Sequence, residues 1–594
     1  MSTQQKKWKS SSQVADVCVV GAGIAGICAA IAAARHNVSV ILVHDRPVPG
    51  GASSSESRMH ICGADRHNHL PFLRETGILE ELQLSNLQQN PFRNHSIWDT
   101  VLYNTLVTQP NLSFHLNTSC MEASLTSDGS TIKEISCLQL TTNTILQISA
   151  RTFIDASGDG VLAPLSGALF RQGREGKKEF NEPQAPDIPD NKTMGNSVLF
   201  AAKDTQIPCS FSPPSWAYSF PHEEDLPFGA PGHSHLDMGY WWIETGGEED
   251  TIADAESIRH ELLRILFGVW DHIKNHCIYK DRASTWTLDW IQFLPTKRES
   301  RRYIGDHILT ENDILSCQPF EDIVAYGGWS LDDHQPGGFH DKDFKKIPNP
   351  NDEKYLTPSP YAIPFRSLYS RNINNLMCAG RCISCTHRAL SSTRVMGTCA
   401  AIGQTTGTAA ALAIHANCLP RKYGTKHIHD LQQTLLLDDC WLPGKTLEMA
   451  DFVKKADLLA SEGDPETLRD GINRPVDNIS HRWQCDPGGS VEYQFQKTSF
   501  IKEVILIFDS SLDKLITMSK LQPDNQLTVP PDTLCKSFRL ETSISGKKVL
   551  LFAENNNYQR FVRIPLHTSL STLTLTLLAS RGDDTIKLYG FYPL

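Results

Sequence analysis

The sequence predicts an α/β domain that is interrupted by an inserted domain and followed by an antiparallel β-sandwich. A buried strand, a glycine-rich turn and an alanine-rich helix occupy 17–34, and strand–glycine turns return near residues 155 and 380. After residue 465, short stretches alternate apolar and polar residues, which is typical of antiparallel strands. At 594 residues the chain is too long for one core. We expect the α/β domain over 14–170 and 366–455, the inserted domain over 171–365 and the sandwich over 466–594.

The composition is that of a globular protein, with 40% hydrophobic and 21% charged residues. A formal net charge of −11 argues against a nucleic-acid partner. The first apolar run, Val17–Val20, leads directly into a glycine motif and so predicts a strand rather than a signal peptide. No stretch approaches the ~18 apolar residues of a membrane span. We therefore expect no membrane partner and a cytoplasmic location, and the oligomeric state stays open.

The first glycine motif predicts a Rossmann-like dinucleotide site. Gly21, Gly23 and Gly26 have the spacing G-x-G-x-x-G, and Ala25 lies between the last two. Gly21 permits the tight turn, Gly23 lets the backbone approach a diphosphate, and Gly26 lets the helix pack closely on the strand. The start of the helix offers unpaired N–H groups and a partial positive charge to that diphosphate.

The second strand ends where a ribose-binding residue is expected. An acidic residue commonly occupies this position, but here His44 aligns with it and Asp45 follows. Either a neutral His44 or an inward-turned Asp45 is a candidate for the ribose contact. The next residues predict a loop that wraps the cofactor, through Arg46, the glycine pair Gly50 and Gly51, and the small hydroxyl residues Ser53 and Ser54.

Two further segments point to FAD rather than NAD. A strand runs into the turn Ala156-Ser157-Gly158, and a later strand ends in Ala379-Gly380-Arg381. A long helix is expected from about residue 393 to 415, and it carries Gly403, Gln404 and Gly407, which allow the close approach of another backbone.

Together these blocks, over 14–415, resemble the FAD-dependent oxidoreductases of the glutathione-reductase-like structural type, in the branch with a G-G-x-S-S-S loop. The resemblance implies that the turn at 156–158 lies near the ADP half of FAD and that the strand ending at Gly380 and Arg381 reaches the flavin. It also implies that the helix carrying Gly403 and Gln404 points its N-terminus at the pyrimidine edge. A helix N-terminus there stabilises the negative charge of a reduced flavin.

The chemistry is expected where polar residues follow the late strand. His387 is the first candidate for the base that removes a hydroxyl proton as hydride leaves the carbon. Arg394 is a candidate for holding an anionic substrate or the flavin. After the first cofactor loop, His60 is a further catalytic candidate, and Arg58 is as well suited to FAD phosphate or a loop carboxylate as to substrate.

The inserted region offers weaker candidates. The run from Tyr240 to Glu244 combines aromatic rings with a carboxylate, as sugar sites do, but tandem aromatic residues also form cores. Three arginines lie within 298–302, where a salt-bridged surface is the simpler interpretation. His233 and His235 share a loop, but no further ligand with zinc spacing is evident, so we predict no metal site.

The sequence holds 16 cysteines, and its one cysteine cluster is interpreted as structural. Cys378, Cys382 and Cys385 lack the spacing of haem attachment and the four thiolates of an iron–sulfur site. Whether they are redox-active stays open.

The C-terminal region resembles discoidin-like, galactose-binding-type modules, with Asp470–Arg474, Trp483 and a closing strand over 586–591. We expect Trp483 to be a core residue, and whether the sandwich binds glycan stays open.

The preferred hypothesis is therefore an FAD-dependent oxidoreductase, a dehydrogenase or oxidase, that takes hydride from a small and sugar-like alcohol. The alternatives are a flavin-dependent monooxygenase, an iron–sulfur flavoprotein of the heterodisulfide-reductase-like type and a non-catalytic carbohydrate-binding protein.

Overall fold

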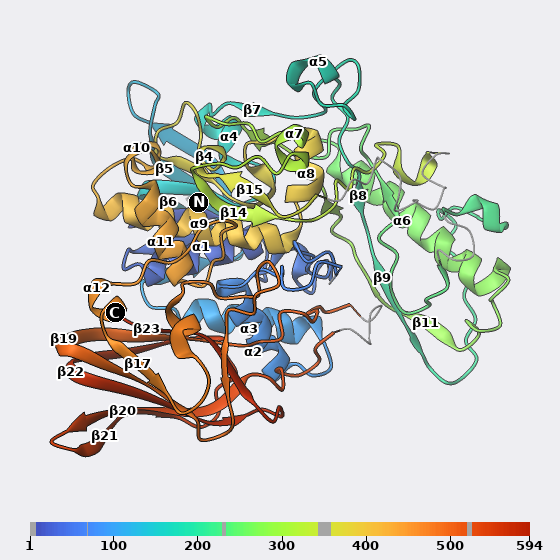
Figure 1. The fold of residues 1–594 in the computed structure, drawn as a ribbon. Helices are drawn as coiled ribbons and strands as arrows, with labels where there is room; N and C mark the ends of the chain where they lie inside the picture. The colour runs from blue at the N-terminus through green and yellow to red at the C-terminus, as the bar shows by residue number, and fades with distance from the viewer. Residues whose placement is uncertain (1–7, 68, 228–232, 342–357, 520–525) are drawn as a thin grey trace, which may run out of the picture.

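The structure is a computed structural model that describes residues 8–67, 69–227, 233–341, 358–519 and 526–594. Figure 1 shows a central α/β body, a region drawn in green to its right and a β-sandwich drawn in orange and red below it. This is the fold class that the sequence predicts. The domain limits given above stay predictions.

The central sheet holds the glycine turns at one edge. Its strand order is β3-β2-β1-β6-β5-β4, and β16 pairs with the end of β6. β1, β2, β3, β6 and β16 run parallel, so their carboxyl ends meet at the same edge. The strands are β1 Lys9–Val20, β2 Val40–Val43, β3 Leu112–His115, β4 Thr118–Leu125, β5 Ile132–Gln139, β6 Thr144–Asp155 and β16 Leu376–Cys378.

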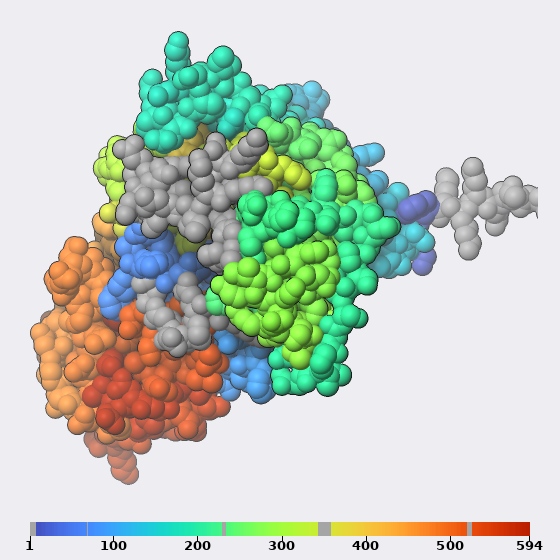
Figure 2. Space-filling view, turned by 90° about the vertical axis from the view of Figure 1, so that its right-hand side faces the viewer, coloured from blue at the N-terminus to red at the C-terminus, as the bar shows by residue number. Residues whose placement is uncertain are grey.

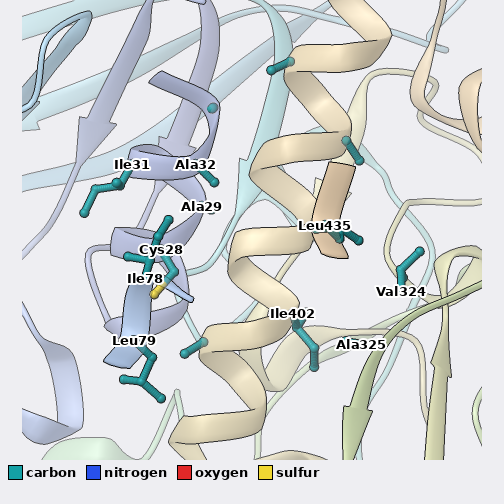
Figure 3. Close-up of a cluster of buried hydrophobic side chains, with 14 of the residues drawn as sticks. Cys28, Ala29, Ile31, Ala32, Ile78, Leu79, Val324, Ala325, Ile402 and Leu435 are labelled. Carbon is teal, nitrogen blue, oxygen red and sulfur yellow. The ribbon is translucent and has the colours of Figure 1, made fainter. Parts of the chain in front are cut away.

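Helix α9 connects the two separated halves of this domain. It crosses α1 at Gly403 and Gly407, where an added Cβ would lie 2.1 Å from the Ala25 carbonyl oxygen and 2.0 Å from that of Ala29. Figure 3 shows the two helices side by side, with Ile402 on the face of α9 that turns toward Val324 of β14. The helices are α1 Ile24–Arg35, α2 Ile78–Gln89, α3 His95–Thr108, α4 Leu162–Ser166, α8 His387–Thr393, α9 Met396–His415, α10 Pro420–Lys426, α11 Ile428–Leu437 and α12 Asp451–Lys454.

The helix expected from about residue 393 to 415 is α9, and a separate short helix, α8, lies before it. α8 ends at Thr393 and α9 begins at Met396, because Val395 adopts an extended conformation between them. None of the helices in the described part of the chain combines the length and the apolar character needed to cross a bilayer.

The region between the two halves has its own core, built from apolar residues of 198–291 together with Phe339. Leu309, Val324 and Ile363 belong instead to the main core, so part of this region packs on the α/β domain. Its elements are β7 Phe170–Arg171, α5 Lys177–Phe180, β8 Asn196–Ser197, β9 Phe200–Asp204, η2 Glu223–Asp225, β10 Glu244–Thr245, α6 Ala255–Asp271, η4 His272–His276, β11 Trp286–Ile291, β12 Thr296–Lys297, β13 Arg302–Tyr303, α7 Glu311–Leu315, β14 Ile323–Gly327 and β15 Tyr361–Pro364.

The C-terminal sandwich is antiparallel, with the strand order β18-β23-β19-β22-β20-β21 and with β17 paired to β19. Where the sequence predicts short strands, β19 and β22 are instead long strands of 19 and 20 residues. Register shifts such as the one between Gln494 and Ser499 let these strands bend, and bulges are a common cause of such bending. The strands are β17 Asp457–Ala460, β18 Trp483–Cys485, β19 Ser490–Phe508, β20 Cys535–Ile544, β21 Lys547–Glu554, β22 Phe561–Ser580 and β23 Ile586–Pro593. Trp483 is 2% exposed, which makes it a core residue as expected.

Buried ion pairs dock the sandwich on the α/β domain. Arg560 donates to Asp439 at 2.7 Å and lies 3.5 Å from Glu80 of α2. Arg474 donates to the backbone carbonyls of Phe72 and Arg74 at 2.9 and 3.2 Å. Figure 2 shows blue N-terminal atoms between the orange and red sandwich and the green region. The loop that precedes α2 is therefore held by the sandwich.

Candidate functional site

The first glycine turn divides into two packed glycines and one open glycine. A Cβ added at Gly21 would lie 2.5 Å from the Ala156 carbonyl oxygen, and one added at Gly26 would lie 1.8 Å from that of Gly21. A Cβ added at Gly23 would meet no atom within 4 Å. Gly23 is also the N-cap of α1, and no side chain caps the helix there. The turn thus leaves space and unpaired N–H groups beside Gly23, as a bound diphosphate requires.

The other glycine turns lie around the same point. Gly50 donates its N–H to the Ala22 carbonyl at 2.7 Å, and a Cβ on Gly51 would lie 3.0 Å from the Gly23 Cα. A Cβ on Gly380 would lie 3.2 Å from that of Ala25. Because the turn at Ala156 contacts Gly21, all four glycine turns of the sequence converge.

The residue at the end of β2 is His44 rather than an inward-turned Asp45. The Nδ1 atom of His44 accepts a hydrogen bond from the Ala22 N–H at 3.1 Å, which places the proton on Nε2. That Nε2 is buried and has no hydrogen-bond partner in the described part of the chain. Burial lowers the pKa of His44, so the ring is neutral near pH 7. The Asp45 side chain is 63% exposed. His44 therefore offers an unused N–H donor that fits a ribose hydroxyl.

The second cofactor loop is held by its own side chains. Ser53 and Ser54 donate their hydroxyls to the carbonyls of Gly50 and Gly51 at 3.0 and 2.7 Å. Arg46 forms a two-pronged ion pair with Glu56, with contacts of 3.0 and 2.7 Å. These three side chains shape the loop from within, which is a structural role.

The structure places the Arg58 side chain against an aromatic ring of the inserted region, and its role toward FAD phosphate stays a prediction. Its guanidinium carbon lies 4.3 Å from the ring centre of Trp290 in β11. Burial lowers the pKa of this arginine, with Asp289 and Asp99 acting in the opposite direction. Arg58 therefore links the cofactor loop to the inserted region.

The turn at 156–158 is stabilised by Asp155. One carboxylate oxygen accepts from the N–H and hydroxyl of Ser157 at 3.0 and 2.6 Å, and the other accepts from Leu162 N–H and Tyr303 hydroxyl at 2.8 and 2.7 Å. Burial is the first cause of a raised pKa at Asp155, and its hydrogen bonds oppose it. Four donors make this carboxylate the organiser of the turn, and the sequence interpretation did not single it out.

Arg381 bridges the turn and the inserted region. A Cβ on Gly158 would lie 2.6 Å from its guanidinium, and Arg381 also donates to the Lys297 carbonyl of β12. Lys297 in turn pairs with Asp159 at 2.6 Å. Gly158 is thus needed for the close approach of Arg381.

Gln404, an expected cofactor residue, has both ends of its amide engaged by the protein. Its side-chain oxygen accepts the N–H of Ile78 at 2.8 Å at the start of α2, and its nitrogen lies 3.4 Å from the Asp438 carbonyl. Gly403 likewise contacts the Ala25 carbonyl and serves the packing of α9 on α1. Both residues lie seven or more positions inside α9, away from the N-terminus that the resemblance assigns to the flavin.

A carboxyl group that sequence reasoning missed lies at that N-terminus. Glu75 accepts from Ala64 N–H at 2.9 Å and from Thr398 hydroxyl at 3.1 Å, and a Cβ on Gly397 would lie 2.6 Å from it. Burial raises the pKa of Glu75 to about 7. A glutamate 322 positions before Gly397 carries no local signal in the sequence.

His387 is not a free base. It is 1% exposed, and its ring nitrogens contact Glu299 at 2.7 Å and Asp333 at 2.9 Å. Burial alone would lower its pKa, but the two carboxylates outweigh burial and raise it to about 10. An imidazolium with both nitrogens engaged has no lone pair for a proton, so the catalytic role expected for His387 is corrected to a structural one.

The pairs around His387 continue into a buried ionic network. Glu299 also pairs with Arg302, which contacts Glu175 at 2.8 Å. Asp333 also pairs with Arg388 at 2.7 Å. Arg298 and Arg302 are therefore buried ion-pair residues, with Glu244 and Glu175 as partners from distant segments, whereas Arg301 is half-buried.

Arg394 belongs to a second ionic network that faces the start of α9. It donates to the Asp332 carboxylate at 2.9 Å, and its Nε is buried without a hydrogen-bond partner among the described residues. Asp332 also contacts His334 at 3.3 Å, and Glu244 joins His334 to Arg298 at 2.7 and 3.1 Å. Arg394 thus has a positive charge and an Nε–H group that is free to donate a hydrogen bond to a ligand.

The aromatic run in the inserted region splits between core and surface. Tyr240 and Trp242 are buried in the second core. Trp241 is 37% exposed and meets the His334 ring edge-on, with the ring centres 6.0 Å apart. The aromatic and acidic residues of 240–244 therefore contribute Trp241 and Glu244 to the surroundings of Arg394.

His60 lies between the cofactor loop and α9. Its neighbour Met59 donates to the Ala52 carbonyl at 2.9 Å, and Cys62 accepts from Gly397 N–H at 2.7 Å. The half-buried His60 ring lies 5.4 Å from that of His67, which meets Trp329 at 5.2 Å. Burial, with His67 second, lowers the pKa of His60 to about 4.

The cysteine cluster does not converge into one group of ligands. Cys378 contacts the Ser367 carbonyl at 3.7 Å and Cys382 the Asp155 carbonyl at 3.3 Å. Burial raises the pKa of both, and it raises that of Cys385 to about 12. Among the residues that the structure describes, these thiols are buried protonated groups, in line with the structural interpretation.

A family model described as FAD dependent oxidoreductase matches residues 16–435. The chain belongs to this family. FAD is accordingly the cofactor of this oxidoreductase, and the open space at Gly23 with the unused donor of His44 fits its diphosphate and ribose. A comparison with curated protein sequences finds no match.

Among solved structures, the oxidoreductase is similar to a geranylgeranyl bacteriochlorophyll reductase-like protein from Thermoplasma acidophilum, with 12% identity, 72% of this chain and 86% of that chain covered, and a TM-score of 0.31. It is also similar to a variant of E. coli quinol fumarate reductase FrdA, with 14% identity, 72% and 75% covered, and a TM-score of 0.28. Its C-terminal part is similar to the family 32 carbohydrate-binding module of Streptococcus pneumoniae EndoD, with 16% identity, 24% and 99% covered, and a TM-score of 0.19.

Proposed function

We propose that this oxidoreductase oxidises a small polyhydroxylated alcohol of the sugar or glycoside class, and that His60 is the base that takes the hydroxyl proton. The observation that carries the proposal is the position of a neutral, half-buried imidazole between the cofactor loop and the first turn of α9. When bound, FAD supplies the hydride acceptor.

His60 has the protonation state that a base needs. Because burial lowers its pKa to about 4, the ring is neutral at any pH above that value. Neither ring nitrogen has a hydrogen-bond partner within the described residues, so a lone pair is available. His387, which was the first candidate, lacks both properties.

The surroundings of His60 suit a polyhydroxylated substrate. The rings of His67 and Trp329 supply flat aromatic surfaces, and Arg394 with Asp332, whose charges act on the nearby Cys62, supplies charged hydrogen-bonding groups. A small site with apolar walls and a few convergent polar groups is typical of small-molecule binding. Charged groups also form strong hydrogen bonds to hydroxyls.

The test is anaerobic stopped-flow reduction of the FAD-loaded protein by a panel of sugars, glycosides and simple alcohols. We expect at least one sugar to bleach the flavin. The variant His60→Gln should retain FAD and its absorption spectrum but be reduced about 10²–10⁴-fold more slowly, which is the usual contribution of a positioned base. Above about pH 5 the wild-type rate should be flat, because the base is already deprotonated.

The exposed His69 provides a matched control, since His69→Gln changes the same residue type in the same loop and should reduce at the wild-type rate. Equal rates for His60→Gln and the wild type would remove His60 from the reaction. A flavin that no alcohol reduces, but that a nicotinamide does, would instead favour a monooxygenase.

A further inference from the structure

Four metal-binding side chains meet at the C-terminal end of α6, outside the candidate active site. They are Glu223, His233, His272 and Cys277, and one ligand atom of each lies within 4.8 Å of all the others. His272 and His233 are fully buried, and Cys277 is 1% exposed. No zinc spacing is evident in the sequence, because the four residues are spread over 223–277 and only two of them, His272 and Cys277, are close in the chain.

A wide helical turn brings His272 and Cys277 together. After α6, residues His272–His276 form a π-turn, in which Cys277 donates its N–H to the His272 carbonyl at 2.7 Å. Such i to i+5 turns are rare and occur frequently at functional sites. Glu223 is tied to the same point, because its carboxylate accepts the Ile278 N–H at 3.0 Å.

Neighbouring groups orient two of these side chains as ligands. The Nδ1 atom of His272 lies 2.7 Å from the Phe220 carbonyl oxygen, which can only accept a hydrogen bond, so Nδ1 carries the proton and the lone pair is on Nε2. Metal-binding histidines are commonly held by such a bond from their other nitrogen. Tyr279 donates its N–H to the sulfur of Cys277 at 3.2 Å.

Two ligand atoms lack a hydrogen-bond partner in the described part of the chain, although each lies within ion-pair distance of another member of the cluster. His272 Nε2 and one oxygen of Glu223 are buried without a hydrogen-bond partner. Buried polar atoms are normally satisfied, so an unsatisfied pair that faces the same point calls for a bound species.

Two of three separations between ligand atoms match a tetrahedral zinc ion, and the third, between His233 and Cys277, is shorter and would have to widen. His233 Nε2 lies 3.0 Å from the Cys277 sulfur and 3.3 Å from Glu223, and His272 Nε2 lies 3.4 Å from Glu223. Zinc bond lengths of about 2.0–2.3 Å place tetrahedral ligands about 3.3–3.6 Å apart. A thiolate, a carboxylate and two neutral imidazoles also cancel the charge of Zn²⁺, and this mixture of nitrogen and sulfur excludes the oxygen-preferring Mg²⁺ and Ca²⁺.

We propose that Glu223, His233, His272 and Cys277 form a structural Zn²⁺ site. Four protein ligands close the coordination sphere, which is the pattern of structural rather than catalytic zinc. The site fastens Glu223 of η2 and His233 to the end of α6. It does so close to the run 240–244, since the Tyr240 hydroxyl donates to the His235 carbonyl at 2.7 Å. Zinc thereby supports the segment 240–244, which places Trp241 and Glu244 near Arg394.

The first test is metal content. The full-length protein is stripped with a chelator, incubated with excess Zn²⁺ and gel-filtered, and its zinc is measured by mass spectrometry. We expect one zinc per chain in the wild type and in the control His235→Gln, which changes an exposed histidine two positions from a ligand. Loss of an outer-shell partner weakens metal binding roughly 10–100-fold. The variants His233→Gln and Cys277→Ser each lose a direct ligand, so their zinc affinity should fall by more than that. Their FAD content should be unchanged.

A second measurement uses the wild type alone, so it tests the site even if the ligand variants fail to fold. With Co²⁺ in place of Zn²⁺, a tetrahedral site with one thiolate gives visible bands at wavelengths longer than the flavin absorption. A wild-type protein that takes up no stoichiometric zinc and gives no such bands would overturn the proposal. So would folded ligand variants that bind zinc as tightly as His235→Gln.

Discussion

The substitution Gly23→Ala separates the folding of the glycine turn from its binding of cofactor. The φ angle at Gly23 is −65°, and an added Cβ would meet no atom within 4 Å. Alanine is therefore compatible with the fold, and it stabilises such positions by about 0.4–1 kcal/mol through the unfolded state. The same methyl group fills the space beside the start of α1 that the FAD diphosphate requires.

The expected loss of affinity follows from the backbone bonds at stake. If the diphosphate is pushed away from one N–H donor, the cost is about 1.5–3 kcal/mol for a charge-assisted hydrogen bond. That corresponds to FAD binding roughly 10- to 150-fold more weakly. Gly26→Ala is the matched contrast, since its Cβ would lie 1.8 Å from the Gly21 carbonyl oxygen. It should lose at least about 1–3 kcal/mol of folding stability, because backbone cannot move aside as a side chain can.

Thermal melting of the apoproteins and titration with FAD, followed by flavin fluorescence, measure the two effects separately. Gly23→Ala should melt at or slightly above the wild-type temperature and bind FAD weakly, whereas Gly26→Ala should melt well below it. Wild-type FAD affinity in Gly23→Ala would refute the placement of the diphosphate at this turn.

Three further predictions concern buried charges. Burial raises the pKa of Glu75 from 4.5 to about 7, so between these pH values the folded protein holds a proton that the unfolded chain releases. Stability therefore falls as pH rises across that window. Glu75→Gln should flatten this decline in thermal melts between about pH 5 and 8, and an unchanged slope would contradict the prediction. His387→Gln leaves Glu299 and Asp333 without their shared cation and should cost about 3–5 kcal/mol in urea unfolding, while the folded fraction keeps its rate of flavin reduction. Arg560→Ala should cost a similar ~3–5 kcal/mol and speed proteolysis between the sandwich and the α/β domain, and a variant that melts like the wild type would show that the pair does not hold the domains together.

The parts of the fold that local patterns determine were predictable. G-x-G-x-x-G between a strand and a helix marks the turn at Gly21 because Gly21 and Gly26 pack against backbone, whereas Gly23 borders open space. The fate of His44 was left open in the sequence, since only the structure shows that its Nδ1 is used by Ala22 and its Nε2 is not.

The parts that depend on distant pairing were not predictable. His387 reads as a base in a polar loop, but Glu299, which is 88 positions away, and Asp333 turn it into a buried cation. The continuity of β19 was missed because its bulge reads as a turn. The contact of Gln404 was missed because the helix start that it caps, Ile78, lies 326 positions earlier.

The crossing of α1 and α9 joins residues that the ribosome produces far apart in time. Gly403 and Gly407 fit against Ala25 and Ala29 only after the whole intervening region has been made. At about 5–20 residues per second, that interval lasts roughly 20–80 s. During it the nascent chain exposes the apolar face of α1, so chaperone capture should peak on ribosomes stalled before α9 and fall once that helix has emerged.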